Sequence, residues 1–405
     1  MVFTEQIRID KIPEILDLHF LTGKAVLLLG PPGIGKSDIV RQFAITKAEK
    51  LNRIFVDWHD ISGTEKEEEI LKNPEKYFLF VDIKLYEYDP TDIKGFIYID
   101  EKNEKTVILP WNWIKFFTKE DSAGIIFLDE LNMASPDTVK IAFQLVYQRV
   151  ISNRRISKNV LIVSAGNPVE YNFLASELPA PLIDRMGIYY VYTNFNSWLK
   201  WASNKNIHPL ILKFLSLYPQ YLYYDKRFEN QNVPRICTPR SWAMLSDLIY
   251  AIEKKLGNNG DSNLKYNYIR AVSSGYLHPE VYSRFVGFLN AIKNTNIQKI
   301  TENLIDNPEN ILSIKNNIEQ IIVFVSYVST QYVNNKLEEE KFKNILKMLY
   351  SVHTEASTLL LIEIINKIKA MYTDHEAKQK LQKLVDLLSR EFPDLYDLLI
   401  KLIVG

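Results

Sequence analysis

The sequence predicts a parallel α/β domain followed by an entirely helical region. Runs of Val, Ile, Leu and Phe recur through the first half of the chain without polar alternation, and helix-like segments separate them. Such runs are typical of strands that helices bury on both faces. After about residue 195 the runs stop and only helical periodicity continues. We therefore expect an α/β domain at 1–195, a helical lid domain at 196–293 and an α-helical extension at 294–405.

The strands and helices follow from this periodicity in chain order. The expected strands are 25–29, 53–58, 77–82, 125–128, 160–164 and 189–192, with a helix at 37–50. Residues 95–109 predict a β-hairpin around the charged run 101–105. The polar run 258–262 predicts a loop. The expected later helices are 198–203, 209–217, 239–256, 267–276, 279–293, 311–332, 337–350, 355–372, 376–391 and 394–404.

Composition narrows the class of protein. The chain has 405 residues, with 49 Lys and Arg against 49 Asp and Glu, so no global basic field attracts nucleic acid. Cys237 is the only cysteine, which excludes an internal disulfide and is typical of a reducing compartment. The most apolar helical run, 321–328, is too short to span a bilayer. These features predict a cytoplasmic protein that does not enter a membrane.

A glycine-rich loop lies between the first long strand and the first long helix. It matches the pattern G-x-x-x-x-G-K-[ST], in which backbone N–H groups and the helix N-terminus surround phosphate oxygens. Lys36 would contact the β- and γ-phosphates of ATP, and the Ser37 hydroxyl would bind Mg²⁺. The alternative, a chance turn, is disfavoured by the strand and helix on either side. The cofactor-binding residues are Gly30, Pro31, Pro32, Gly33, Ile34, Gly35, Lys36 and Ser37.

Two carboxylates follow the strand at 125–128. Ligands bind at the carboxyl edge of parallel sheets, so Asp129 is placed to hold Mg²⁺ and Glu130 to activate the attacking water. The alternative is that this acidic pair caps the N-terminus of a helix, a role that Asn132 or Ser135 could also fill. The phosphate loop favours the catalytic interpretation.

An amide follows the strand at 160–164. Asn167 would lie beside the acidic pair at the same edge and could position water or contact the γ-phosphate. The alternative is a simple Asn-Pro turn with Pro168.

The order of these motifs over residues 5–290 resembles AAA+ ATPases, and within them the MoxR-like branch. The resemblance rests on the phosphate loop, 92–95, 128–132, 148–149, 165–168 and 182–185, together with Trp111 and Trp113. It implies that Asn167 is the first sensor and Arg185 a finger that acts on a neighbouring subunit. Arg240, which follows Pro239 at the start of a lid helix, would be the second sensor. Met186-Gly187 stands where the family more often has Phe.

The resemblance also implies an assembly. It predicts a ring, with six subunits as the expected number, and a hairpin at 95–109 that faces a pore or a partner, the alternative being a ribbon packed on its own domain. Arg149, Arg154 and Arg155 are weaker finger candidates, expected to be structural or pore-facing. The part beyond residue 293 resembles no family that we recognise. Its helices predict either an enlarged lid or a partner-binding region.

Three functions remain open on the sequence alone. The leading one is a MoxR-like ATPase that hydrolyses ATP to remodel a protein client, for which the resemblance implies a von Willebrand factor A domain protein. The alternative is a nucleic-acid motor, such as a helicase or a viral or mobile-element replication ATPase. A third is a nucleotide-gated assembly protein with slow turnover. The neutral charge and the lack of aromatic-basic series for stacking bases weigh against the motor.

Overall fold

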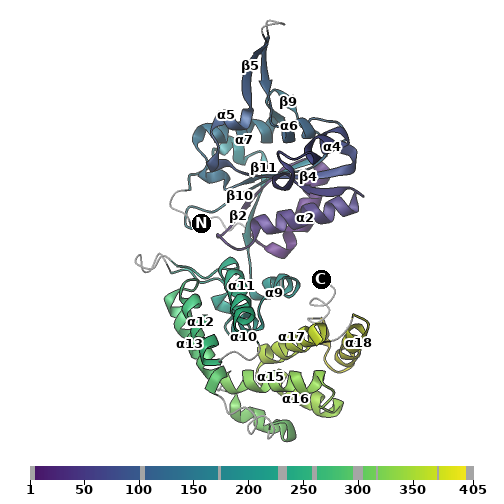
Figure 1. Ribbon diagram of the computed structural model, residues 1–405, viewed down its shortest axis with the longest axis vertical. Coiled ribbons are helices and arrows are strands. Elements are labelled where there is room, and N and C mark those ends of the chain that lie inside the picture. Colours follow the sequence, from purple (N-terminus) through teal and green to yellow (C-terminus); the bar gives the residue numbers. More distant parts are fainter. Residues whose placement is uncertain are drawn as a thin grey trace. The chain divides into compact units, whose positions relative to one another are not determined.

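The computed structural model describes residues 5–100, 105–171, 175–226, 235–257, 262–294, 304–315, 318–371 and 374–397. The chain divides into two compact units, Met1–Thr193 and Asn194–Gly405. The first unit contains the sheet, and the described part of the second contains helices and one isolated β-bridge (Figure 1). The predicted loop at 258–262, the centre of the 101–105 run and the end of the 394–404 helix lie largely outside the described residues.

Unit 1 is built on a parallel sheet of seven strands. The strand order is β1-β11-β2-β10-β7-β4-β3, and every neighbouring pair is parallel. This confirms the predicted fold class. The strands are β1 Gln6–Arg8, β2 Ala25–Leu29, β3 Ile54–Asp57, β4 Tyr77–Lys84, β7 Ala123–Asp129, β10 Val160–Gly166 and β11 Met186–Tyr192.

Helices cover both faces of this sheet, as the uninterrupted apolar strands require. The helices of unit 1 are α1 Ile12–Thr22, α2 Lys36–Lys50, α3 Trp58–Ile61, α4 Lys66–Lys72, α5 Pro90–Lys94, α6 Asn112–Phe117, α7 Pro136–Gln148 and α8 Ala180–Ile183. Short 3₁₀ turns are Ile9–Lys11, Pro74–Lys76, Leu85–Glu87 and Leu131–Met133.

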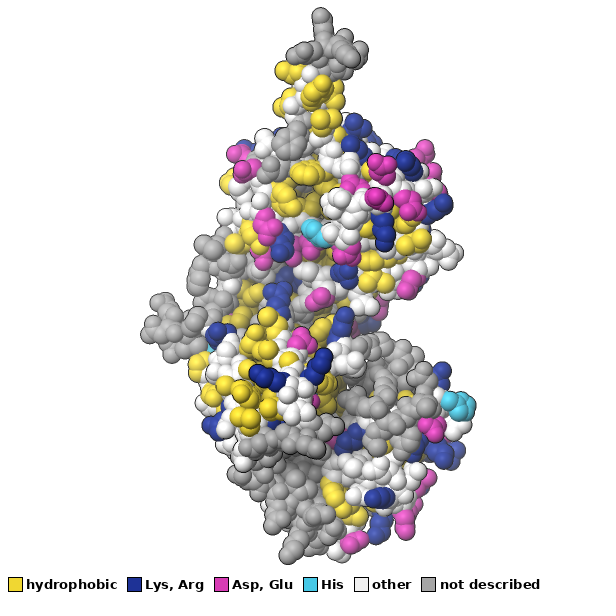
Figure 2. Space-filling view, viewed as in Figure 1, with side chains coloured by type: hydrophobic (Ala, Val, Ile, Leu, Met, Phe, Trp, Pro, Cys, Tyr) yellow, Lys and Arg dark blue, Asp and Glu magenta, His cyan; other side chains and the backbone are white. Residues whose placement is uncertain are grey.

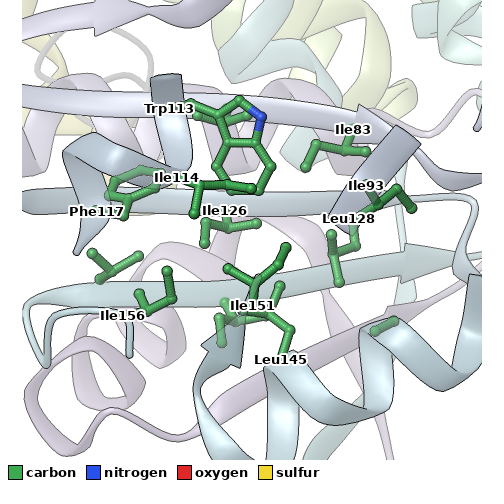
Figure 3. Packing of buried hydrophobic residues seen from close by; sticks show 14 of the residues in the cluster. Ile83, Ile93, Trp113, Ile114, Phe117, Ile126, Leu128, Leu145, Ile151 and Ile156 are labelled. Carbon is green, nitrogen blue, oxygen red and sulfur yellow. The ribbon is translucent and has the colours of Figure 1, made fainter. Parts of the chain in front are cut away.

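The two faces of the sheet bury different side chains. On one face, Ile126 and Leu128 of β7 pack with Trp113 of α6 and Leu145 of α7 (Figure 3). On the other face, Phe80 and Phe127 stack with ring centroids 6.2 Å apart, and Phe20 of α1 stacks on Phe78. Alternate residues of each strand therefore point to opposite helical layers, and the carboxyl ends of the strands share one edge.

The predicted hairpin is present as β5 Phe96–Asp100 and β6 Lys105–Leu109, which pair antiparallel. It projects from unit 1 and carries apolar side chains, visible as yellow atoms in Figure 2. Ile97 and Ile99 are 73% and 66% exposed. Gly95 permits the hairpin to close, because its φ is +90° and an added Cβ would lie 2.3 Å from the Leu109 carbonyl oxygen.

Unit 2 is a set of packed helices. They are α9 Phe195–Asn204, α10 Pro209–Leu217, α11 Pro239–Leu256, α12 Ser262–Ser274, α13 Pro279–Asn294, α15 Ile318–Val333, α16 Glu339–Val352, α17 Thr354–Met371 and α18 Asp374–Glu391, with 3₁₀ helices at Pro219–Tyr221 and Pro308–Ile314. The predicted helix at 311–332 is thus divided: its first residues belong to the 3₁₀ helix. No helix among the described residues is long and apolar enough to cross a membrane.

A buried charge network joins helices that are far apart in the sequence of unit 2. Glu363 of α17 is 5% exposed, and its Oε1 lies 2.9 Å from Nζ of Lys213 in α10. Ser329 of α15 donates to Glu363 Oε2 at 3.0 Å, and Lys367 Nζ lies 3.3 Å from the same oxygen. The early helices of unit 2 are therefore bound to its C-terminal helices by buried ions as well as by apolar packing.

Candidate nucleotide-binding site

The phosphate-binding loop connects β2 to α2, as the sequence predicts. Gly33 and Gly35 have φ values of +73° and +100°, which residues with a Cβ rarely adopt. Gly35 is the N-cap of α2, and no side chain caps this end of the helix. The N-terminus of a helix this long, with its amides uncapped, favours an anion such as a phosphate group.

Lys36 is buried at the first position of α2. Its ammonium donates to the backbone carbonyls of Gly30 at 2.7 Å and Pro31 at 2.9 Å. It also donates to Oδ1 of Asn167 at 2.9 Å. The lysine charge is thereby placed inside the loop and in contact with the end of β10, where a bound phosphate would compete for it.

Ser37 meets the carboxylate that ends β7. Its hydroxyl donates to Oδ2 of Asp129 at 2.9 Å. Glu130 follows with φ +52° and ψ +41°, a left-handed conformation that costs energy for a residue with a side chain. The chain turns sharply here, so Asp129 and Glu130 occupy the carboxyl edge of the sheet, one directly after the other.

Asn167 follows the last residue of β10 and is 8% exposed. The side-chain amide of Asn132 donates to its backbone carbonyl at 2.6 Å. Asn132 itself is 5% exposed, and its Oδ1 has no hydrogen-bond partner among the described residues. These contacts tie the segment after β7 to the segment after β10.

Three aspartates lie on neighbouring strands under α2. Asp129 accepts from Ser37 of α2, and Asp57 of β3 accepts from Nε of Arg41, one turn further along the same helix, at 3.0 Å. Asp82 of β4 lies between them, and its buried Oδ1 has no hydrogen-bond partner among the described residues. Burial, followed by the charge of Asp129, raises the pKa of Asp82 to about 6.

Arg185 directly precedes β11. None of its described contacts is with Lys36 of its own chain. Its Nη1 donates to the Pro181 carbonyl of α8 at 2.7 Å. Its guanidinium carbon lies 4.3 Å from the centroid of the Tyr147 ring and 5.5 Å from that of Phe143, both on α7. The side chain is 31% exposed.

The other arginines predicted from the sequence lie in different surroundings. Arg149 is structural: it donates to the carbonyls of Gly23, Ser157 and Val160, and burial lowers its pKa. Arg154 and Arg155 are exposed in a small hairpin of unit 1. Arg240 belongs to unit 2, where it is exposed in the first turn of α11 after the Thr238 cap. Its role as second sensor stays a prediction.

The donor set of the site fits Mg²⁺ bound together with phosphate. Ser37 and Asp129 offer a hydroxyl and a carboxylate oxygen at one point, and magnesium prefers such oxygen ligands. Within the described ranges no group of three or more His, Cys, Asp or Glu forms a complete metal cage. Magnesium commonly keeps several waters and uses substrate phosphates with one or two protein ligands, so two ligands suffice.

Three residues of this region escaped the sequence analysis as functional candidates. Asp82 is the last residue of the expected strand 77–82. A carboxylate at the carboxyl end of a parallel strand could have marked it as a candidate for the site. Asn132 was considered only as a cap. Tyr147 had no signal, because its contact with Arg185 depends on how α7 and α8 pack.

Comparisons with known proteins give distant structural likenesses. No protein-family model and no curated protein matches the sequence. The Thermotoga maritima RuvB Holliday junction branch migration motor is 13% identical, with 65% of this chain and 68% of that chain covered and a TM-score of 0.31. The Aeropyrum pernix ORC2 protein is 10% identical, covering 94% and 86%, with a TM-score of 0.34. NtrX from Brucella abortus in complex with ADP is 13% identical, covering 84% and 68%, with a TM-score of 0.35. Likenesses this distant leave the function to be inferred from the chain's own site.

Proposed function

We propose that this chain is an ATPase of the AAA+ class, from the MoxR-like branch. The observation that supports this most directly is the convergence of three strand ends on one helix N-terminus. Lys36 and Ser37 begin α2 and contact Asn167 and Asp129, which are 131 and 92 residues away in the sequence. A glycine loop, a cation, a hydroxyl, a carboxylate and an amide in this arrangement are what phosphoryl transfer to water requires.

Each residue has a distinct role in the proposed reaction. Lys36 and the loop amides neutralise and hold the phosphates. Ser37 and Asp129 hold Mg²⁺, which supplies charge stabilisation to the phosphoryl group when bound. Glu130 accepts a proton from the attacking water, and Asn167 orients that water or the γ-phosphate.

The remaining assignments concern assembly. Arg185 contacts α7 and α8, and none of its described contacts is to the phosphate loop of its own chain. This fits a residue that serves a neighbouring subunit, where it would stabilise charge on the transferring group. We propose a ring, six-membered by resemblance, that remodels a protein client of the von Willebrand factor A domain class. By the same resemblance, we propose Arg240 as the second sensor.

The ATPase assignment is tested by separating binding from chemistry. Lys36→Ala should abolish binding of an ATP analogue in isothermal titration, because it removes the charge inside the loop. Glu130→Gln should keep binding, since Ser37 and Asp129 remain, and should lower turnover by at least about a hundredfold. Lys24→Ala, an exposed lysine before β2, is the matched control and should behave as wild type. Unchanged binding by Lys36→Ala would contradict the site.

The client class is tested by stimulation of turnover. Addition of a purified von Willebrand factor A domain protein should raise ATP hydrolysis, whereas double- and single-stranded DNA should have no effect. Stimulation by DNA alone would instead support the nucleic-acid motor.

A further inference from the structure

Arg185 is held by an aromatic surface on α7. Tyr147 and Phe143 are one helical turn apart, and their rings stack with centroids 5.7 Å apart and an interplanar angle of 26°. Arg185 places its guanidinium carbon 4.3 Å from the Tyr147 centroid. A guanidinium at this distance from an aromatic face is attracted by the negative charge density of the ring.

A second contact fixes the orientation of the same group. Nη1 of Arg185 donates to the Pro181 carbonyl at 2.7 Å, and Asp184 lies 3.7 Å from Nη1. The guanidinium is thus restrained on its face by the ring and at one nitrogen by the backbone of α8. Its Nε is buried and has no hydrogen-bond partner among the described residues.

The exposure of the two aromatic residues separates their roles. Phe143 is half-buried and packs against the hydrophobic core of unit 1, so its ring is already fixed by that packing. Tyr147 is 54% exposed, which is unusual for a ring whose only task is core packing. Its described aromatic and cationic contacts are with Phe143 and Arg185.

We infer that Tyr147 is a positioning residue for Arg185. The ring holds the guanidinium in one orientation before a neighbouring subunit presents its nucleotide, so less side-chain freedom is lost when the arginine engages. Pre-ordering of a charged group in this way lowers the barrier without adding a contact to the substrate. The inference rests on the proposed function, in which Arg185 acts on the neighbouring site.

A positioning role for Tyr147 predicts a change in kcat without a change in KM. Tyr147→Ala should lower kcat by about three- to tenfold, the loss expected for one cation–π contact. KM for ATP and the affinity for an ATP analogue should stay unchanged, because the subunit's own phosphate loop is intact. Tyr147→Phe keeps the ring face and should restore wild-type kcat. Lys140→Ala, exposed on α7 two turns before Tyr147 and paired at the surface with Asp137, is the control and should turn over as wild type.

Mixed assemblies distinguish positioning from a general effect on folding. Tyr147→Ala subunits have an intact site and a poorly held Arg185, while Lys36→Ala subunits have the reverse. A mixture should therefore exceed the activity of both variants alone, normalised per intact site. A merely structural defect of Tyr147→Ala would stay with its own subunit and show no such gain. Thermal unfolding of each variant checks that the fold is retained.

The outcomes separate the positioning role of Tyr147 from the finger role of Arg185 and from the ATPase proposal. Loss of activity in Arg185→Ala with wild-type kcat in Tyr147→Ala overturns the positioning role and leaves the ATPase proposal standing. Wild-type activity in Arg185→Ala overturns both the finger and its positioning residue. A lower kcat in Tyr147→Ala that Tyr147→Phe does not restore also overturns the role of the ring.

Discussion

The side-chain amide of Asn132 donates a 2.6 Å hydrogen bond to the backbone carbonyl of Asn167. Both residues are buried, and each follows a strand that ends at the candidate site. An added Cβ at Gly166 would lie 2.6 Å from Oδ1 of Asn132, so the two segments approach as closely as a glycine allows. Asn132 therefore fastens the segment after β7, which begins with Glu130, to Asn167 after β10, beyond the last paired residues of the two strands.

Asn132→Ala should weaken both the fold and the chemistry. It removes the partner of a buried carbonyl, which typically costs about 1–3 kcal/mol of unfolding free energy. Because Asn167 is then held less well, we expect kcat to fall by about tenfold, as for a misplaced catalytic group. Urea unfolding and steady-state ATP hydrolysis measure the two effects. Asn73→Ala, whose amide bonds the Glu69 carbonyl at an exposed position, is the control and should change stability by less than about 0.5 kcal/mol.

Asp82 should make the metal-free protein less stable as the pH rises. Its pKa is about 6 in the folded chain against an ordinary value of 3.8, so folding favours the protonated form. Its stabilising contribution is full below about pH 4 and is lost as the pH rises through about 6. Asp82→Asn removes this dependence, and should stabilise the protein at pH 7.5 more than at pH 4.5. Chemical unfolding in EDTA at both pH values measures the difference. An equal effect at the two pH values would show that Asp82 titrates normally.

Arg185→Ala should leave ATP binding intact and lower turnover by about a thousandfold or more, the range known for arginine fingers. Lys36→Ala subunits are inactive for the opposite reason. A mixture should regain part of the activity, because an intact Lys36 site can then meet an intact Arg185 from its neighbour. Size-exclusion chromatography must show that mixed assemblies form. Mixed assemblies without any gain in turnover would mean that Arg185 does not act between subunits.

Lys213→Met should destabilise unit 2 by about 2 kcal/mol, because it removes one of the two lysines that neutralise the buried carboxylate of Glu363 and leaves only Lys367. Glu363, its partner, is 5% exposed. Lys341→Met is the control, because Lys341 pairs with Asp306 near the surface with side chains 46% and 66% exposed. Such pairs contribute at most about 1 kcal/mol. Urea unfolding followed by circular dichroism measures the free energy of unfolding of both variants. Equal losses of this free energy would mean that Glu363 is better solvated than its burial indicates.

The sequence predicted the sheet well because its central strands are buried on both faces. Their uninterrupted apolar runs are typical of strands that helices cover on both faces. The glycine loop between β2 and α2 was predictable because its residue spacing is the one that phosphate binding requires. The edge strand β1 was not predicted, since Gln6, Ile7 and Arg8 carry no such run and only one side of the strand is paired. Local patterns also could not reveal Asn132 or Tyr147, whose roles arise from packing between segments distant in sequence, whereas Asp82 at the end of an expected strand did carry a signal.

The ion network around Glu363 limits how the gene can be divided. Lys213 lies in α10, well before residue 294, while Glu363 and Lys367 lie in α17. A chain ended near residue 300 would lose α15 and α17, leaving a buried lysine and an apolar surface of α10 exposed to water. Transplanting the C-terminal helices onto another protein would likewise leave Glu363 with Lys367 alone, because its other lysine partner, Lys213, lies outside the graft. Expression boundaries, fusions and domain exchanges should therefore keep residues 194–397 as one segment.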